Sequence, residues 1–179
     1  MIRTHVGYAG GTKENPTYHN LGDHSETIQI EYDPNQISYE ELLDIFWNAH
    51  TPTARPYSRQ YASFVFYHDE AQRKLAIETK EQQEAKRGTI YTEIVPAGTF
   101  YPAEDYHQKY YLRNARDLMQ EFNAIYPNAD DFAASTAAAR VNGYLGRHGT
   151  CEQFLEEVNS LGLTAAGVDR VKQSVCFSR

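Results

Sequence analysis

The chain has 179 residues, of which 41% are hydrophobic and 23% are charged, and its formal net charge is −7. This length accommodates one domain with a sizeable core. The acidic balance, without any basic stripe, argues against nucleic acid as a partner. No apolar run reaches membrane-spanning length and no signal peptide is recognisable at the N-terminus, so we expect a cytoplasmic protein that does not enter a membrane.

Two strands are predicted near the N-terminus, with a loop between them. Residues 1–8 alternate weakly between apolar and polar side chains, which predicts the first strand. A polar loop follows over 12–22. Residues 26–33 (ETIQIEYD) alternate more strictly, which predicts a half-buried strand whose apolar face carries Ile28 and Ile30.

Helices are predicted where a capping residue precedes an apolar pattern. Ser38 followed by Glu41 is the pattern of a capping box, and apolar residues then recur at helical spacing as far as Trp47. A long polar helix is predicted over 69–86, ended by a glycine. Between these helices, the aromatic segment 61–67 (YASFVFY) is predicted to be a strand.

The rest of the chain is predicted to become progressively more helical. A strand is expected over 90–95 and a short helix over 103–112, and Thr150 begins a second capping box. Strands that alternate with helices, followed by helices alone, indicate an α+β fold. We therefore predict an α+β core over 1–114 and a helical C-terminal extension over 115–179.

Four patches of sequence combine polar and aromatic residues in a recognisable order. They are GYAGG with NPTY at 7–18, DHSE at 23–26, SYEELL at 38–43 and TFYPAEDYHQ at 99–108. In this collinear order they resemble the class A peptide methionine sulfoxide reductase family over roughly 2–114.

The resemblance implies a fold and a reaction. The fold would be a ferredoxin-like two-layer core that lacks its first strand and helix. The reaction needs no metal or organic cofactor: a cysteine thiolate attacks the sulfur of methionine-S-sulfoxide, either free or in proteins. A resolving thiol then closes a disulfide, which thioredoxin reduces.

The resemblance also assigns roles to three residues. Tyr18 and Tyr61 match the tyrosines that bind the sulfoxide oxygen, and Glu26 matches the general acid. Phenols and a protonated carboxyl supply donors that strengthen as charge develops on the oxygen, and burial would keep the acid protonated. From the residues alone, each also has a plainer interpretation, as a turn residue, an exposed strand end or a strand aromatic.

Two departures from the family separate this chain from an ordinary reductase. The loop before Tyr61 lacks the aspartate of the family and places Ser58 or Arg59 in that neighbourhood. The Gly-Cys-Phe-Trp element that carries the nucleophile belongs before Ile2 and is absent from the 179 residues. We therefore predict that the chain as written is N-terminally truncated and inactive.

The remaining candidates for thiol or metal chemistry are few. Cys176 is a possible resolving thiol on a C-terminal tail, whereas Cys151 is interpreted as a bystander, and two thiols are not expected to form a disulfide scaffold. Glu104 and His107 stand at i, i+3, which is half of a di-metal signature, and no second copy exists in the sequence. We predict no metal site.

Two functions stay open at this point. Either the reading frame begins too late and the full protein is a thioredoxin-dependent reductase, or the chain is a non-catalytic truncated paralogue that acts as a binding or interaction protein. A poorly folding gene relic is a third, plainer possibility. Loss of an interior strand would expose apolar faces and unpaired backbone groups, and this cost favours the late start.

Overall fold

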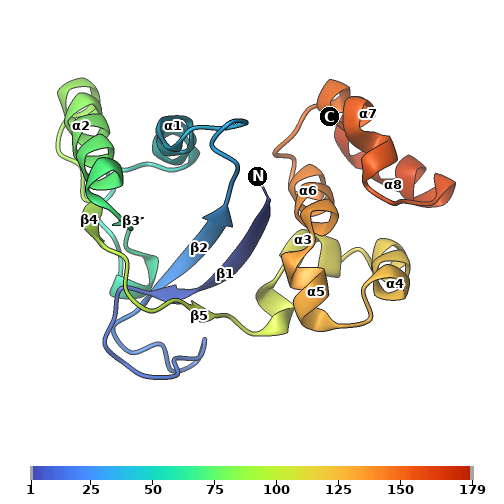
Figure 1. The fold of residues 1–179 in the computed structure, drawn as a ribbon, viewed down its shortest axis with the longest axis horizontal. Coiled ribbons are helices and arrows are strands. Elements are labelled where there is room, and N and C mark those ends of the chain that lie inside the picture. The colour runs from blue at the N-terminus through green and yellow to red at the C-terminus, as the bar shows by residue number, and fades with distance from the viewer. Residues whose placement is uncertain (1, 178–179) are drawn as a thin grey trace. The chain divides into compact units, whose positions relative to one another are not determined.

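The computed structural model describes residues 2–177, which form two compact units. Unit 1 is Val6–Ala103, and unit 2 combines Ile2–His5 with the chain from Glu104 onward (Figure 1). The units contain strands and helices in a mixed α/β fold, which confirms the predicted class. The ferredoxin-like arrangement and the domain boundary after Asn114 stay predictions, because compactness does not measure independent folding. Met1, where the first strand was expected to begin, lies outside the described residues.

The strands form two small sheets. A three-stranded sheet has the order β2-β1-β5, with Gly7 of β1 opposite Pro102 of β5 in antiparallel pairing. In a separate sheet β3 and β4 run parallel, with Phe64 opposite Glu93. The bounds of the strands are β1 Arg3–Ala9, β2 Ser25–Glu31, β3 Phe64–Tyr67, β4 Glu93–Pro96 and β5 Tyr101–Pro102.

In unit 1, helix α2 packs against β3 and β4, and helix α1 packs against α2 (Figure 1). Helix α1, Tyr39–Ala49, begins with the predicted capping box: the Ser38 hydroxyl accepts the Glu41 amide at 3.1 Å, and the Glu41 carboxylate accepts the Ser38 amide at 2.7 Å. Helix α2, Glu70–Arg87, is capped by the side chain of Asp69. The buried residues between these elements are Leu43, Trp47, Val65, Ala76 and Ile90.

Two predictions for unit 1 were wrong in detail. Ile28 was expected on a half-buried face, but its side chain is 57% exposed. Tyr61 was expected in a strand, but it lies in the 3₁₀ turn η1, Arg59–Tyr61, and β3 begins three residues later. Alternation and aromatic content describe a pleated surface and do not say whether another element covers it, or where a strand begins.

Gly7 allows β1 and β5 to approach closely, and its replacement by alanine is expected to destabilise unit 1. An added Cβ would lie 2.3 Å from the Tyr101 carbonyl oxygen and 2.5 Å from the Phe100 ring. Overpacking of this kind costs about 1–3 kcal/mol. Urea unfolding followed by the fluorescence of the buried Trp47 measures the loss.

Gly98→Ala is the matched control for Gly7→Ala, because an added Cβ there meets nothing within 4 Å. We expect this control to change the free energy of unfolding by less than about 0.5 kcal/mol. Equal midpoints for the two variants would contradict the close-approach explanation.

Unit 2 is helical apart from the first residues of β1. Its core gathers aromatic and aliphatic side chains from successive helices, among them Phe122, Phe132 and Phe154. No helix within residues 2–177 is both long enough and apolar enough to cross a membrane. The bounds are η2 Asp105–His107, α3 Tyr110–Arg113, α4 Arg116–Ile125, α5 Ala129–Ala134, α6 Thr136–Leu145, α7 Cys151–Glu157, η3 Val158–Ser160 and α8 Ala165–Cys176.

The single helix predicted over 103–112 is in fact two short turns. Lys109 lies between η2 and α3 in the left-handed region, with φ of 54°. Its side chain is buried and its ammonium donates to the Thr4 carbonyl at 2.6 Å. Burial lowers the pKa of Lys109 to about 8. This long-range contact with β1 is invisible to a local pattern.

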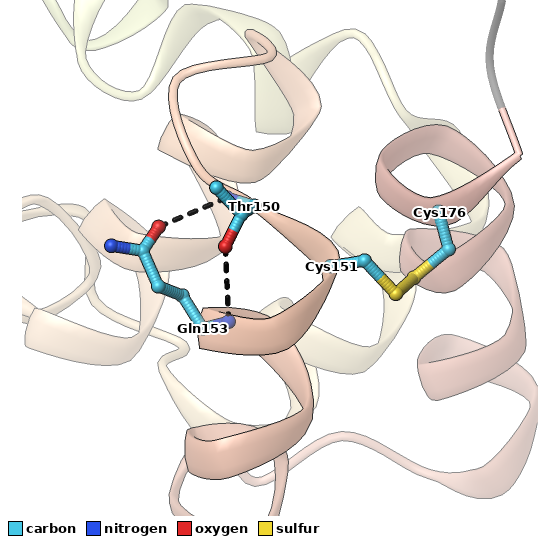
Figure 2. Close-up of a disulfide and its surroundings, with 4 residues drawn as sticks. All are labelled: Thr150, Cys151, Gln153 and Cys176. Atoms are coloured by element: carbon cyan, nitrogen blue, oxygen red, sulfur yellow. Dashed lines mark hydrogen bonds between the residues drawn. A yellow bond between two sulfur atoms is a disulfide. The ribbon is translucent and has the colours of Figure 1, made fainter.

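A disulfide between Cys151 and Cys176 joins α7 to α8 (Figure 2). Cys151 is the first residue of α7, directly after the N-cap Thr150, whose predicted capping box with Gln153 is confirmed. Cys176 is the last residue of α8. The expectations of a bystander Cys151 and of a Cys176 on a free tail are therefore both wrong, because two helices distant in sequence bring the thiols together.

Candidate active site

The loop between β1 and β2, which carries Tyr18, is fixed by the two residues before Ser25. The carboxylate of Asp23 accepts the Thr12 amide at 2.8 Å and the Lys13 amide at 3.2 Å. These hydrogen bonds, chiefly that of Thr12, lower the pKa of Asp23 to about 2. The buried ring of His24 accepts the Gly11 amide at Nδ1, so its Nε2 carries the hydrogen and donates to the Lys13 carbonyl at 2.7 Å.

Arg59 connects the turn η1, which carries Tyr61, to the strands around it. Its guanidinium pairs with Glu93 at 2.9 Å and donates to the Gly10 carbonyl at 3.3 Å. Its own carbonyl accepts the Ser25 hydroxyl at 2.5 Å. The sequence indicated Arg59 only as a departure from the family, whereas the structure makes it a link between β2, β4 and the end of β1.

The three predicted site residues lie close together. The pKa of Tyr61 is raised, first by its electrostatic interaction with Tyr18, then by burial, by a hydrogen bond with the Tyr18 side chain and by the charge of Glu26. Gln60, the residue before Tyr61, donates its amide to a carboxylate oxygen of Glu26 at 2.7 Å. Residues from the loop after β1, from β2 and from η1 therefore meet at one place in unit 1.

This arrangement can present hydrogen-bond donors to a ligand oxygen. The Tyr61 phenol is a protonated donor at neutral pH, as phenols ordinarily are, and the upward shift of its pKa makes it a still weaker acid. In a hydrogen-bonded pair of phenols one hydroxyl donates to the other, and the hydrogen of the accepting hydroxyl stays available to a third oxygen. Glu26 itself is exposed, which differs from the expected buried acid.

An apolar groove of about 360 Å³ begins at Glu26. Consecutive residues of β2 (26–30) and of the segment that enters β3 (62–66) line it, so it runs along one edge of each sheet. Its apolar walls include Ile28 and Phe64. Tyr61 lines a second cavity of about 280 Å³, and Tyr18 lines neither. The groove therefore offers a surface for an apolar group next to the carboxyl group of Glu26.

The thiols and the acid–histidine pair lie in unit 2. The two cysteines of the chain are joined to each other. Glu104 and His107 face each other at 3.9 Å. Within residues 2–177, no group of three or more histidine, cysteine, aspartate or glutamate side chains is placed to hold a metal ion.

Comparison with known proteins assigns the family. The family model for peptide methionine sulfoxide reductase matches residues 1–140, which is most of the chain. The chain belongs to the class A peptide methionine sulfoxide reductase family. The predicted resemblance is thus confirmed.

Relatives of known sequence and structure agree with this assignment. A peptide methionine sulfoxide reductase of Drosophila melanogaster is 46% identical over 92% of this chain and 67% of its own length. Peptide methionine sulfoxide reductase A5 of Oryza sativa subsp. japonica is 42% identical over 80% of this chain and 59% of its own length. The chain therefore spans only about three fifths to two thirds of these relatives.

Solved structures of the family share the fold over part of the chain. Mxr1 from Saccharomyces cerevisiae in its reduced form is 32% identical, with a TM-score of 0.59 over 63% of this chain and 71% of Mxr1. Methionine sulfoxide reductase A of Corynebacterium diphtheriae gives a TM-score of 0.53 at 32% identity, over 63% of each chain.

Proposed function

We propose that Tyr18, Glu26 and Tyr61 form the oxygen-binding part of a peptide-methionine (S)-S-oxide reductase site. The observation that carries the proposal is the convergence of these three side chains: Gln60, next to Tyr61, donates to Glu26 at 2.7 Å, and the Tyr61 phenol interacts with Tyr18 and with the charge of Glu26. The phenols would hold the sulfoxide oxygen, and the apolar groove next to Glu26 would receive the methyl group and side chain of methionine. The substrate class is methionine-S-sulfoxide, free or in proteins.

The proposed reaction balances with two thiols. A thiolate attacks the sulfoxide sulfur and forms an S–S bond, and Glu26 delivers one proton to the oxygen as the S–O bond breaks. The second thiol gives up the other proton of the departing water and attacks the sulfur of the first thiol. This attack breaks the bond to the methionine sulfur, releases methionine and closes the disulfide. Methionine sulfoxide is reduced to methionine, and the thiol pair is oxidised to the disulfide. Burial favours the protonated form of a carboxyl, so bound substrate would have to cover the exposed Glu26 for it to act as an acid. Thioredoxin is the proposed reductant of the disulfide.

The nucleophile is the part that the 179 residues do not supply. Their only cysteines, Cys151 and Cys176, are bonded to each other, although Cys176 stays our candidate for a resolving thiol. We therefore expect the 179-residue chain to reduce no methionine-S-sulfoxide above the heat-denatured control, with either dithiothreitol or thioredoxin. Product methionine, quantified by chromatography, is the measurement.

Two results separate the possible explanations of an inactive chain. Turnover that disappears in a Cys176→Ser variant would contradict the prediction and assign the nucleophile to α8. An in-frame Gly-Cys-Phe-Trp element in the DNA upstream of Met1 would support the reductase, whereas an immediate stop codon would exclude it for this gene product.

A binding protein is the second candidate function, and the retained oxygen-binding residues favour it. Such a protein would recognise methionine sulfoxide without reducing it. NMR titration of the 179-residue chain with N-acetyl-methionine-S-sulfoxide amide should then shift signals of Tyr61 and Gln60. Equal affinity for the corresponding methionine compound would exclude recognition of the sulfoxide oxygen.

A further inference from the structure

A second cavity, of about 280 Å³, lies beside the proposed oxygen site and shares Tyr61 with it. The side chains of Tyr57 and Tyr91 also line it, and Pro52 and Pro56 belong to the loop around it. Its lining, as the structure describes it, includes one arginine and neither aspartate nor glutamate. We call this cavity the Arg55 pocket.

The Arg55 pocket is rich in hydrogen-bond donors and free of negative charge. Three phenols and the guanidinium of Arg55 border it, in a chain whose formal net charge is −7. Arg55 lies 5.5 Å from the ring centroid of Tyr91 and has no ion-pair partner in the part of the chain that the structure describes. Arg59, by contrast, is already paired with Glu93. Arg55 is therefore available to an external anion.

A chain of hydrogen bonds holds the inner wall of the pocket in place. The Phe46 carbonyl lies 2.8 Å from Nδ1 of His50, so that nitrogen must donate. Nε2 of His50 then accepts the Ser63 hydroxyl at 3.0 Å, and Ser63 in turn accepts the Thr92 hydroxyl at 3.1 Å. Both nitrogens of His50 are thus used within the wall, which leaves Arg55 and the phenols to contact a ligand.

We propose that the Arg55 pocket binds a carboxylate that the substrate carries a few bonds away from the sulfoxide. This inference rests on the proposed function, because Tyr61 links the two sites. A guanidinium binds a carboxylate through two parallel hydrogen bonds, and phenol hydroxyls add further donors. The carboxylate has two possible sources: an acidic side chain next to methionine sulfoxide in a polypeptide, or the α-carboxylate of the free amino acid.

Binding of matched compounds to the 179-residue chain tests the proposal without requiring turnover. We would titrate the labelled chain by NMR with N-acetyl-Met(S-oxide)-Asp amide and with its Asn counterpart. The Asp compound should bind roughly three- to fivefold more tightly, the range expected of a partly exposed ion pair. The preference should shrink in 0.5 M salt, because salt screens exposed charges.

Arg55→Gln should abolish the preference and leave the affinity for the Asn compound unchanged. Lys86→Gln, which removes an exposed cation from α2, is the matched control and should keep the preference. If the preference for the Asp compound persists in Arg55→Gln, or is absent in the parent chain, the proposed role of the Arg55 pocket is wrong, whereas the proposed function is unaffected. If neither compound binds, the proposed function fails as well.

The same titration distinguishes the two sources of the carboxylate. Free methionine-S-sulfoxide is compared with its N-acetyl amide, which has no carboxylate. If free methionine-S-sulfoxide binds more tightly than its N-acetyl amide, and Arg55→Gln removes this gain in affinity, the pocket binds the α-carboxylate. A gain confined to the Asp compound assigns it to an acidic neighbour and makes polypeptides the substrate class.

Discussion

Replacing Glu26 by glutamine is expected to lower kcat at least about 100-fold in any form of this protein that carries the nucleophilic thiol, because a general acid contributes roughly 10²–10⁴-fold. Glutamine keeps the size of the side chain and cannot give up a proton. Since proton delivery occurs only as the oxygen leaves, kcat and kcat/KM should fall together. Steady-state kinetics with methionine-S-sulfoxide and thioredoxin measures the change.

A pH profile separates an acid from a residue that merely supports the site. Loss of a general acid should also remove the alkaline limb of the pH–rate profile, which a structural defect would not do. Glu81→Gln is the control, since Glu81 is an exposed carboxylate on α2. An unchanged profile in the Glu26 variant would assign the proton to another donor.

The locally encoded features of this chain were predictable from its sequence. The two capping boxes, at Ser38 and Thr150, each need only residues three positions apart, and both are present. The same holds for the cap of α2 at Asp69. Such signals work because the partner amide is supplied by the same turn of helix, whatever the rest of the chain does.

The site was predictable only through the order of its motifs. Tyr18, Glu26 and Tyr61 come from three segments, and no periodicity says that they converge. The residues that hold them were missed: Gln60 donates to Glu26, and Arg59 links η1 to Gly10. Their partners lie more than 30 positions away, so a single sequence carries no signal for these contacts.

The burial of strand side chains and the disulfide could not be predicted from the sequence pattern for the same reason. Ile28 alternates like a half-buried residue, yet whether a strand face is covered depends on a neighbour elsewhere in the chain. Cys151 and Cys176 are 25 residues apart on different helices, and only the packing of α7 against α8 brings their sulfurs together.

Loss of the disulfide between Cys151 and Cys176 is expected to destabilise unit 2 strongly. In the chain-entropy model, a cross-link over 25 residues contributes about 3–4 kcal/mol. Such a loss lowers the melting temperature of a unit of this size by more than about 10 °C. The double variant Cys151→Ser, Cys176→Ser should show faster amide exchange in the unit 2 core, at residues such as Phe154 and Val171.

Unit 1 supplies an internal reference for this measurement. Trp47, the only tryptophan, is buried in unit 1, so its fluorescence shows whether the loss of stability in the double variant stays within unit 2. Dithiothreitol should reproduce the effect in the parent chain and add nothing in the variant. If amide exchange in unit 2 is the same with and without the disulfide, the bond does not stabilise this unit.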